Sequence, residues 1–346
     1  MGTIKPCTFS AQRRFDPREL RGGYSCGSIT AMPKVVITET LDQQCADWLA
    51  EQCEVVWHQH DQPGLDAQLA DADALVVRTY TQVNDALLDQ APNVKVIGRA
   101  GVGLDNFDLP ACEKRGVRVV YTPDANTQAV VEYVLGLILD HVRPRTRLAP
   151  GTDAQTFHAL RKTEVGIELA DLTLGILGMG RIGKRIATVA HAMGINVLGC
   201  DVLPEADIRN AIPNVPFDFV DHATLYAKSN ILTVHTDGRG GNRHLINAEA
   251  LGHLRADVLL INAARGMLVD HDALVDWLDK HPEVTAVLDV HDPEPPAEDH
   301  PLYGCPNAIL LPHLASRTDT ALRNMSWVVR DVVAVLQGKE PTYAAV

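Results

Sequence analysis

The stretch LGILGMGRIGKRIA, residues 174–187, decides the fold. It places Gly178, Gly180 and Gly183 in the spacing G-x-G-x-x-G, directly after a short apolar run. In a strand–turn–helix unit, the first glycine permits a tight turn, the second lets the backbone approach a pyrophosphate, and the third lets helix and strand pack closely. The spacing alone is weak evidence because glycines are common. The neighbouring sequence has to show whether a dinucleotide binds here.

The segments on either side of the motif favour a dinucleotide. Residues 172–177 are typical of a strand, and the residues after Gly183 have a helical period, so free N–H groups at the start of a helix would face the phosphates. The next predicted strand, 196–200, is followed by Asp201, 18 residues after Gly183, close to the spacing of a carboxylate that binds the adenosine ribose. Asp201 would repel a 2′-phosphate, so we expect NAD and not NADP.

Strands and helices alternate along most of the remaining chain. Short β-branched apolar runs predict strands at 34–40, 54–59, 72–78, 94–100, 117–123, 172–177, 196–200, 231–236, 258–264, 284–290 and 308–313. Helical patterns lie between most of them, with a long helix at 126–142, a partial helix within the irregular segment 143–170, and a last helix at 319–338. Continuous apolar strands separated by helices predict an α/β fold with two doubly wound parallel-sheet domains.

Composition excludes several classes of protein. The net charge of −13, from 31 basic and 44 acidic residues without a basic block, argues against nucleic acid or an anionic membrane as partner. No apolar run approaches the roughly 18 residues of a membrane span. Seven cysteines without a C-x-x-C pair indicate a reducing compartment, the cytoplasm, and no metal site. Residues 1–32 lack both a period and the apolar core of a signal peptide, and we expect a disordered extension there.

Three further stretches place charged side chains at the carboxyl ends of predicted strands. INAARG contains Arg265, LDVHDPEPP contains Asp289 and Glu294, and LPHLAS contains His313. Ligands of open parallel sheets bind outside these strand ends, so the side chains should converge beside the nicotinamide. Imidazole is suited to exchange a proton with a substrate hydroxyl, a glutamate would stabilise its charged form, and the forked donors of arginine suit a carboxylate.

Together these motifs resemble the D-isomer-specific 2-hydroxyacid dehydrogenase family. The resemblance runs from Met32 to almost the end of the chain, and GRAGVGLDNFDL (98–109) is similar to the family's substrate loop. It implies an NAD-dependent enzyme that interconverts a D-2-hydroxy acid and its 2-keto acid. It also implies a Rossmann NAD-binding domain at 129–315 and a discontinuous flavodoxin-like substrate domain at 33–128 and 316–346. One departure is Asp237, which replaces the family's proline in HTDGRGGN.

The resemblance also assigns roles to individual residues. The catalytic residues would be Arg265, Glu294 and His313. The residues that bind the cofactor would be Gly178, Gly180, Arg181, Ile182, Gly183, Asp201, Thr236, Ala263 and Asp289. The residues that bind the substrate would be Arg78, Thr79, Ala100, Gly101 and Val102. Asp289 resembles the family residue that contacts the nicotinamide carboxamide, and a buried structural carboxylate is the alternative interpretation.

The identity of the substrate depends on VVRTYTQVNDALL, residues 76–88. This stretch resembles Val-Arg-Ser-x-Thr of D-3-phosphoglycerate dehydrogenases, and Arg78 would suit a phosphorylated acid; a surface ion pair is the alternative. Erythronate-4-phosphate dehydrogenases carry a similar stretch, and glyoxylate, hydroxypyruvate and lactate reductases share the catalytic motifs. Corepressors of this fold, which bind NAD and act through partners, also remain open. We predict a 3-phosphoglycerate enzyme.

The long helix at 126–142 predicts the oligomeric state. Its apolar side chains lie on most of its faces and need more burial than one small domain offers. Members of the family dimerise through elements around the cofactor domain. We therefore expect a homodimer.

Overall fold

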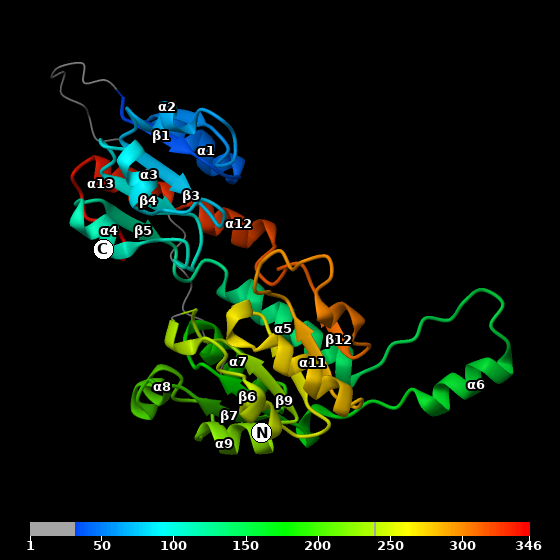
Figure 1. The fold of residues 1–346 in the computed structure, drawn as a ribbon. Coiled ribbons are helices and arrows are strands. Elements are labelled where there is room, and N and C mark those ends of the chain that lie inside the picture. Colours follow the sequence, from blue (N-terminus) through cyan, green and yellow to red (C-terminus); the bar gives the residue numbers. More distant parts are fainter. Residues whose placement is uncertain (1–31, 239) are drawn as a thin grey trace, which may run out of the picture. The chain divides into compact units, whose positions relative to one another are not determined.

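The computed structural model describes residues 32–238 and 240–346, and within these residues the strands form two sheets (Figure 1). The first has five strands in the order β2-β1-β3-β4-β5, and the second has seven in the order β12-β11-β10-β9-β6-β7-β8. Every strand pairing is parallel. The predicted fold class is therefore confirmed. The extension expected at 1–32 lies outside the described residues apart from Met32.

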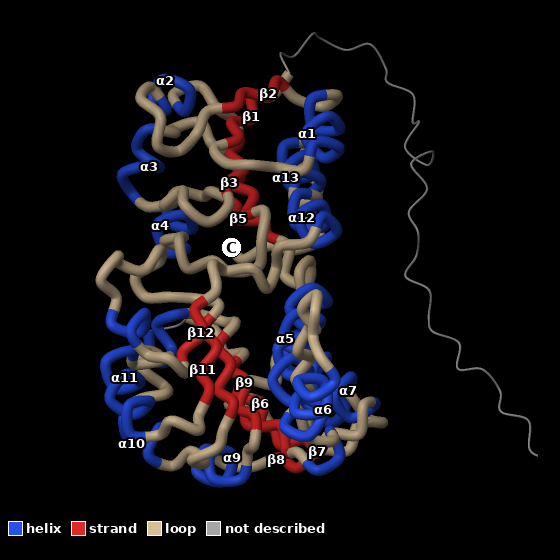
Figure 2. The backbone as a smooth tube through the Cα atoms, turned by 90° about the vertical axis from the view of Figure 1, so that its right-hand side faces the viewer, coloured by secondary structure: helices blue, strands red, loops and turns tan. Residues whose placement is uncertain are grey.

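The first sheet lies between two layers of helices (Figure 2). Its strands are β1 (Lys34–Ile37), β2 (Glu54–Trp57), β3 (Ala74–Val77), β4 (Val96–Arg99) and β5 (Arg118–Tyr121). Its helices include α1 (Gln43–Ala50), α2 (Leu65–Leu69), α3 (Asp85–Gln90) and α4 (Leu109–Lys114). One core cluster joins the sheet to α1, and another joins it to α2, α3 and α4 on the opposite face. Burial on both faces explains the continuous apolar strands.

The second sheet is covered in the same way. Its strands are β6 (Thr173–Leu177), β7 (Asn196–Cys200), β8 (Asp218–Phe219), β9 (Ile231–Val234), β10 (Leu259–Asn262), β11 (Thr285–Leu288) and β12 (Ala308–Leu310). Its helices include α5 (Thr127–Val142), α7 (Arg181–Ala192), α8 (Glu205–Ala211), α9 (His222–Lys228), α10 (Ala248–Gly252) and α11 (His271–Lys280). Short 3₁₀ turns lie at Leu169–Asp171, Gly240–Asn242, Gly266–Leu268 and Pro301–Gly304. The sequence did not predict β8, which has only two residues, neither of them buried.

The helix predicted at 319–338 is two helices, α12 (Asp319–Ser326) and α13 (Val329–Leu336). At the break, the Ser326 hydroxyl donates to the carbonyl of Leu322 at 2.8 Å and accepts from the amide of Asp42 at 3.0 Å. A serine that bonds back to the preceding turn bends a helix, and here it also joins the helix end to the start of α1. The apolar period continues across the break, which explains why the sequence indicates one helix.

Helix α13 packs on the first sheet. A Cβ atom at Gly98 of β4 would lie 2.5 Å from a side-chain carbon of Val332, so only glycine lets the helix approach this closely. The amide of Ala345 then donates to the carbonyl of Val119 in β5 at 2.8 Å. These contacts support grouping residues 316–346 with the first sheet. The domain boundaries at 128/129 and 315/316 stay predictions.

Most helices begin at a side chain that accepts a hydrogen bond from the first turn. These N-caps are Asp42, Asn84, Asp108, Asp153, Asp221, Asn247, Asp270 and Thr318. Such a cap satisfies one of the free N–H groups of a helix start. Helix α7 differs, because its N-cap, Gly180, offers no side chain. In the described part of the chain, no helix is long and apolar enough to cross a membrane.

Candidate active site

The glycine motif forms the turn between β6 and α7. Gly178 has a φ of +99°, which disfavours side chains, and a Cβ atom there would lie 2.7 Å from the backbone of His235. A Cβ atom at Gly183 would lie 2.0 Å from the carbonyl oxygen of Gly178. At Gly180 it would meet nothing within 4 Å, so this side of the turn is open. The turn and the close packing thus require glycine, and the open side leaves room for a ligand.

The surroundings of this turn fit a dinucleotide. The uncapped first turn of α7, which contains Arg181 and Ile182, leaves N–H groups for an anion. Asp201 lies beside the turn, where its carboxylate accepts from the amide of Met179 at 2.5 Å and from that of Leu203 at 2.8 Å. The hydroxyl of Thr236, after β9, is buried without a hydrogen-bond partner among the described residues. Donors, a carboxylate and an unpartnered hydroxyl thus surround the open turn.

His313 and Glu294 form a close pair at the carboxyl ends of β12 and β11. The distance from His313 Nδ1 to Glu294 Oε1 is 2.6 Å. Burial alone would raise the pKa of Glu294, but the hydrogen bond and charge of His313 and the amide of His291 lower it below its ordinary value. The carboxylate therefore stays ionised beside the imidazole. We predict that Nε2, the other ring nitrogen, exchanges a proton with a substrate oxygen.

Asp289 holds the backbone that carries His313. It is fully buried, and its carboxylate accepts from the amides of Leu314 and Ala315 at 2.8 Å and from the Tyr133 hydroxyl at 3.0 Å. His313 itself has a φ of +54°, an unfavourable conformation for a residue other than glycine. The hydrogen bonds that the next two amides donate to Asp289 hold this strained turn in place. The structure thus gives Asp289 a structural role, and contact with a cofactor stays a prediction.

Arg265 follows β10 and contacts the loop after β4. Its Nε and Nη2 atoms each lie 2.8 Å from Oδ2 of Asp105, and Nη1 donates to the carbonyl of Ala264 at 2.7 Å. A Cβ atom at Gly103 would overlap Nη2 of Arg265, at 1.9 Å. The guanidinium therefore lies against the predicted substrate loop. Sequence reasoning missed Asp105, although it is an acidic residue within the loop 98–109.

The predicted substrate residues follow two neighbouring strands, with Arg78 and Thr79 after β3 and Ala100, Gly101 and Val102 after β4. The two segments are joined because the amide of Ala100 donates to the carbonyl of Val77 at 2.9 Å. Nε of Arg78 is buried without a partner in the described chain, and Nη1 makes only a 3.4 Å contact with the carbonyl of Thr40. The described protein therefore leaves at least one donor of this guanidinium without a hydrogen bond.

A second arginine lies beneath the same loop. Arg99 donates from Nε to the carbonyl of Gly103 at 2.9 Å, and its Nη1 atom would lie 2.4 Å from a Cβ atom at Gly101. Burial first, and then the charge of Arg78, lower the pKa of Arg99 to about 10. The two guanidinium groups therefore lie close enough to repel one another. The described residues contain no cluster of three or more side chains that could hold a metal ion.

Comparison with known proteins finds a matching family model, related sequences and similar solved structures. The model of the D-isomer specific 2-hydroxyacid dehydrogenase, NAD binding domain, matches residues 135–315. Glyoxylate reductase of Thermofilum pendens is 36% identical over 90% of this chain and 94% of its own length. D-3-phosphoglycerate dehydrogenase of Methanocaldococcus jannaschii is 33% identical over 89% of this chain, which spans 58% of that protein. The crystal structure of D-lactate dehydrogenase from Aquifex aeolicus, with NAD and lactic acid, is similar to this chain with a TM-score of 0.73 and 26% sequence identity. The match covers 88% of this chain and 96% of that protein.

The pair of His313 and Glu294 leads to the first testable prediction. His313→Ala should lower kcat by about 10²–10⁴, the usual contribution of a positioned acid–base group, with little change in NADH affinity. Glu294→Gln removes the negative charge that stabilises the protonated imidazole, so the pH of half-maximal keto-acid reduction should fall. In the wild type this charge persists until the pH falls through the lowered pKa of Glu294. Steady-state kinetics across pH measures both, and a normal kcat in His313→Ala or an unshifted profile in Glu294→Gln would refute these roles.

Proposed function

Because the chain belongs to the D-isomer-specific 2-hydroxyacid dehydrogenase family, we propose that it interconverts 3-phosphoglycerate and 3-phosphohydroxypyruvate with NAD as cofactor. The family consists of oxidoreductases that act on 2-hydroxy acids with a nicotinamide cofactor. When bound, the cofactor supplies or accepts the hydride. The choice of acid within the family is the open question, and the two arginines after β3 and in β4 bear on it.

The residues of the site divide the chemistry among them. His313 would donate a proton to the carbonyl oxygen of the keto acid, and Glu294 would stabilise the ring while it carries that proton. Arg265 would bind the carboxylate with its forked donors. To bind the substrate, Arg265 would give up part of its ion pair with Asp105. In the loop against which Arg265 lies, the amide of Gly101 donates to the carbonyl of Arg99 at 2.8 Å, so the amides of Val102 and Gly103 would be the ones to bind the same carboxylate.

The proposal of a phosphorylated acid rests on Arg78. Its guanidinium has no strong partner, and it lies within electrostatic reach of Arg99 and Arg317. Burial and then the charge of Arg317 lower the pKa of Arg78. Arg78 and Arg317 repel one another, and the charge of Glu39 offsets this repulsion only in part, so a phosphate would relieve what remains. An uncharged distal group, such as a hydroxyl, would not.

A glyoxylate or hydroxypyruvate reductase is the second candidate. It is favoured by the relative from Thermofilum pendens, which is 36% identical to this chain, against 33% for the phosphoglycerate dehydrogenase from Methanocaldococcus jannaschii. Erythronate-4-phosphate dehydrogenase and an NAD-binding corepressor are further alternatives. Turnover with a panel of 2-keto acids separates the enzymes from a corepressor.

The second prediction tests the phosphate. A charge-assisted contact contributes roughly 1.5–3 kcal/mol, so kcat/KM for 3-phosphohydroxypyruvate should exceed that for hydroxypyruvate by about tenfold or more. Arg78→Ala should remove most of this advantage and leave hydroxypyruvate nearly unaffected. Steady-state kinetics with both acids provides the comparison. A wild type that reduces hydroxypyruvate equally well or better is a general reductase, and the substrate proposed here is then wrong.

Asp201 generates the third prediction. Its carboxylate lies beside the glycine turn, where it would accept from the ribose hydroxyls and repel a 2′-phosphate. The wild type should therefore have a higher kcat/KM with NADH than with NADPH, and Asp201→Ala should narrow the difference. Asp207→Ala, in α8, removes an acidic side chain elsewhere and serves as the control. A wild type that prefers NADPH contradicts this assignment.

The oligomeric state needs a different argument from the one the sequence suggests. Helix α5 buries Val130, Val131, Val134 and Leu135 in the core of its own sheet, so the expectation that it needs an outside partner is wrong. Three of the exposed large apolar side chains, Leu148, Phe157 and Val165, lie instead on residues 143–166, which we call the arm. The amide of Ile167 donates to the carbonyl of Val142 at 2.9 Å and closes the base of the arm.

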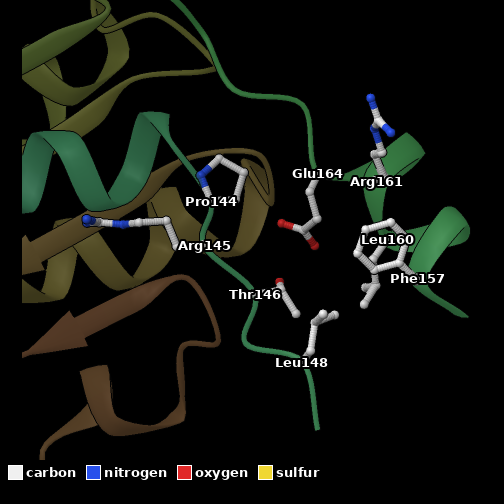
Figure 3. A pocket seen from close by; sticks show the side chains of 8 residues that line it. All are labelled: Pro144, Arg145, Thr146, Leu148, Phe157, Leu160, Arg161 and Glu164. Carbon is white, nitrogen blue, oxygen red and sulfur yellow. The ribbon is translucent and has the colours of Figure 1, made fainter. Parts of the chain in front are cut away.

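We propose that the arm binds a second copy of this chain. Its helix α6 (Ala154–Thr163) buries no residue, and Leu148, Phe157 and Val165 are 52%, 43% and 75% exposed. A hollow between residues 144–148 and one side of α6 remains open (Figure 3). The arm has five basic and two acidic residues, whereas the chain carries −13 overall. A basic, apolar arm is complementary to a second acidic copy, and closed twofold dimers are the commonest assembly.

The fourth prediction follows from the arm. Light scattering at micromolar concentration should give twice the chain mass of 37.7 kDa, and the double variant Phe157→Asp/Val165→Asp should be a monomer. The control is Trp57→Asp, the same kind of change at a side chain in β2 that is 46% exposed. A monomeric wild type refutes the dimer. If the double variant remains a dimer and Trp57→Asp is a monomer, the interface lies at Trp57 and not at the arm.

A further inference from the structure

A buried carboxylate, Glu39, binds the loop after β3. Glu39 lies two residues beyond the end of β1, the neighbour of β3 in the sheet, and is 5% exposed. Its carboxylate accepts from four consecutive amides, those of residues 78 and 79 at 2.9 Å, of residue 80 at 3.1 Å and of residue 81 at 3.0 Å. It also accepts from the Thr81 hydroxyl at 2.9 Å. The catalytic chemistry derived above does not use this side chain.

The carbonyl groups of the same loop are held from the other side. Asn106 donates from its side-chain amide to the carbonyl of Arg78 at 3.1 Å and to that of Thr81 at 2.6 Å. The hydroxyls of Thr38 and Thr81 lie 2.7 Å apart. Because residues 78–81 have their N–H groups occupied by Glu39, the loop cannot offer these N–H groups to a substrate. Its recognition of a ligand therefore depends on its side chains, and Arg78 is the charged one among them.

Glu39 also balances the positive charge of this sheet end. Burial would raise its pKa, but the amides of Thr81, Arg78, Tyr80 and Thr79 lower it below the ordinary value, so the carboxylate stays ionised. Its charge acts on both Arg78 and Arg99 and favours their protonated forms. A buried carboxylate is tolerated only when hydrogen bonds and opposite charges compensate its desolvation. Both are present here.

We propose that Glu39 is the positioning residue that sets selectivity for the distal group of the substrate, by holding residues 78–81 in the conformation that presents Arg78. This role rests on the proposed function, in which Arg78 binds the phosphate of 3-phosphohydroxypyruvate. Glu39 itself does not touch the substrate. It acts through the backbone it binds and through the charge it places beside the guanidinium.

Glu39→Gln tests the role at nearly constant side-chain size. Glutamine keeps one acceptor oxygen and turns an NH₂ group toward donors, so the loop loses its fixed conformation. The KM for 3-phosphohydroxypyruvate should rise roughly tenfold, the worth of one charge-assisted contact. The kcat with this acid and the KM for hydroxypyruvate should change less than about threefold. A merely structural role would instead change the kinetics with both acids together.

Two more measurements support the interpretation of this variant. In an Arg78→Ala background, Glu39→Gln should have no further effect on the KM for the phosphorylated acid, because the side chain it positions is gone. Asp331→Asn is the matched control, since Asp331 is also buried and accepts from the amides of Thr342 and Tyr343, in the same part of the fold but away from residues 78–81. This control should leave both KM values unchanged.

If Glu39→Gln does not fold, Thr81→Val provides the same test in a milder form. It removes only the hydroxyl bonds to Glu39 and Thr38, and should raise the KM for the phosphorylated acid by roughly two- to fivefold. If the wild type prefers the phosphorylated acid and Glu39→Gln keeps that preference, this inference alone is overturned. If Glu39→Gln does not fold, the same conclusion follows from a preference that survives in Thr81→Val. An equal loss with both acids also overturns it. A wild type without preference for the phosphorylated acid overturns the proposed function, and this inference with it.

Discussion

The geometry of the site depends on the hydrogen bonds from the amides of Leu314 and Ala315 to the buried carboxylate of Asp289. They fix the chain immediately after His313, whose left-handed backbone would otherwise relax. With that turn held, the imidazole reaches Glu294 at 2.6 Å, although both side chains remain partly exposed. The bond from Tyr133 joins the same carboxylate to α5. A single buried side chain thus connects the sheet, a helix and the turn that carries His313.

The first sheet has the same arrangement beside the proposed substrate-binding residues. Asp289 follows β11 and binds amides beyond the neighbouring strand β12, while Glu39 follows β1 and binds amides beyond its neighbour β3. In parallel sheets, adjacent strands end at the same edge, so an acidic side chain after one strand meets the free N–H groups after the next. Functional side chains then project from loops whose backbone is already fixed. Such preorganisation favours both proton transfer and selective binding.

The sequence predicted most features that depend on local pattern. The strands, the glycine turn with Asp201 and the residues at strand ends are visible because apolar runs and short motifs identify them. It did not reveal the partners made by tertiary contact: Asp105 beside Arg265, Glu39 beneath residues 78–81, and the break between α12 and α13 at Ser326. The first joins loops of two different sheets, the second depends on β1 and β3 being neighbours, and the third depends on the side-chain bonds of Ser326. The burial of α5 was misjudged for the same reason, because amphipathic pattern alone does not say which elements cover a helix.

The most direct test of this account is the single-turnover rate of Asp289→Asn, followed by the loss of NADH fluorescence on mixing with saturating keto acid. Asparagine keeps the shape of the side chain but turns an NH₂ group toward one of the two amides that the carboxylate binds. If Asp289 holds the His313 turn, the rate of hydride transfer falls by roughly tenfold or more while NADH affinity stays within about threefold of the wild type. A rate equal to that of the wild type, or a defect confined to NADH binding, would contradict the claim that Asp289 acts on the backbone of His313.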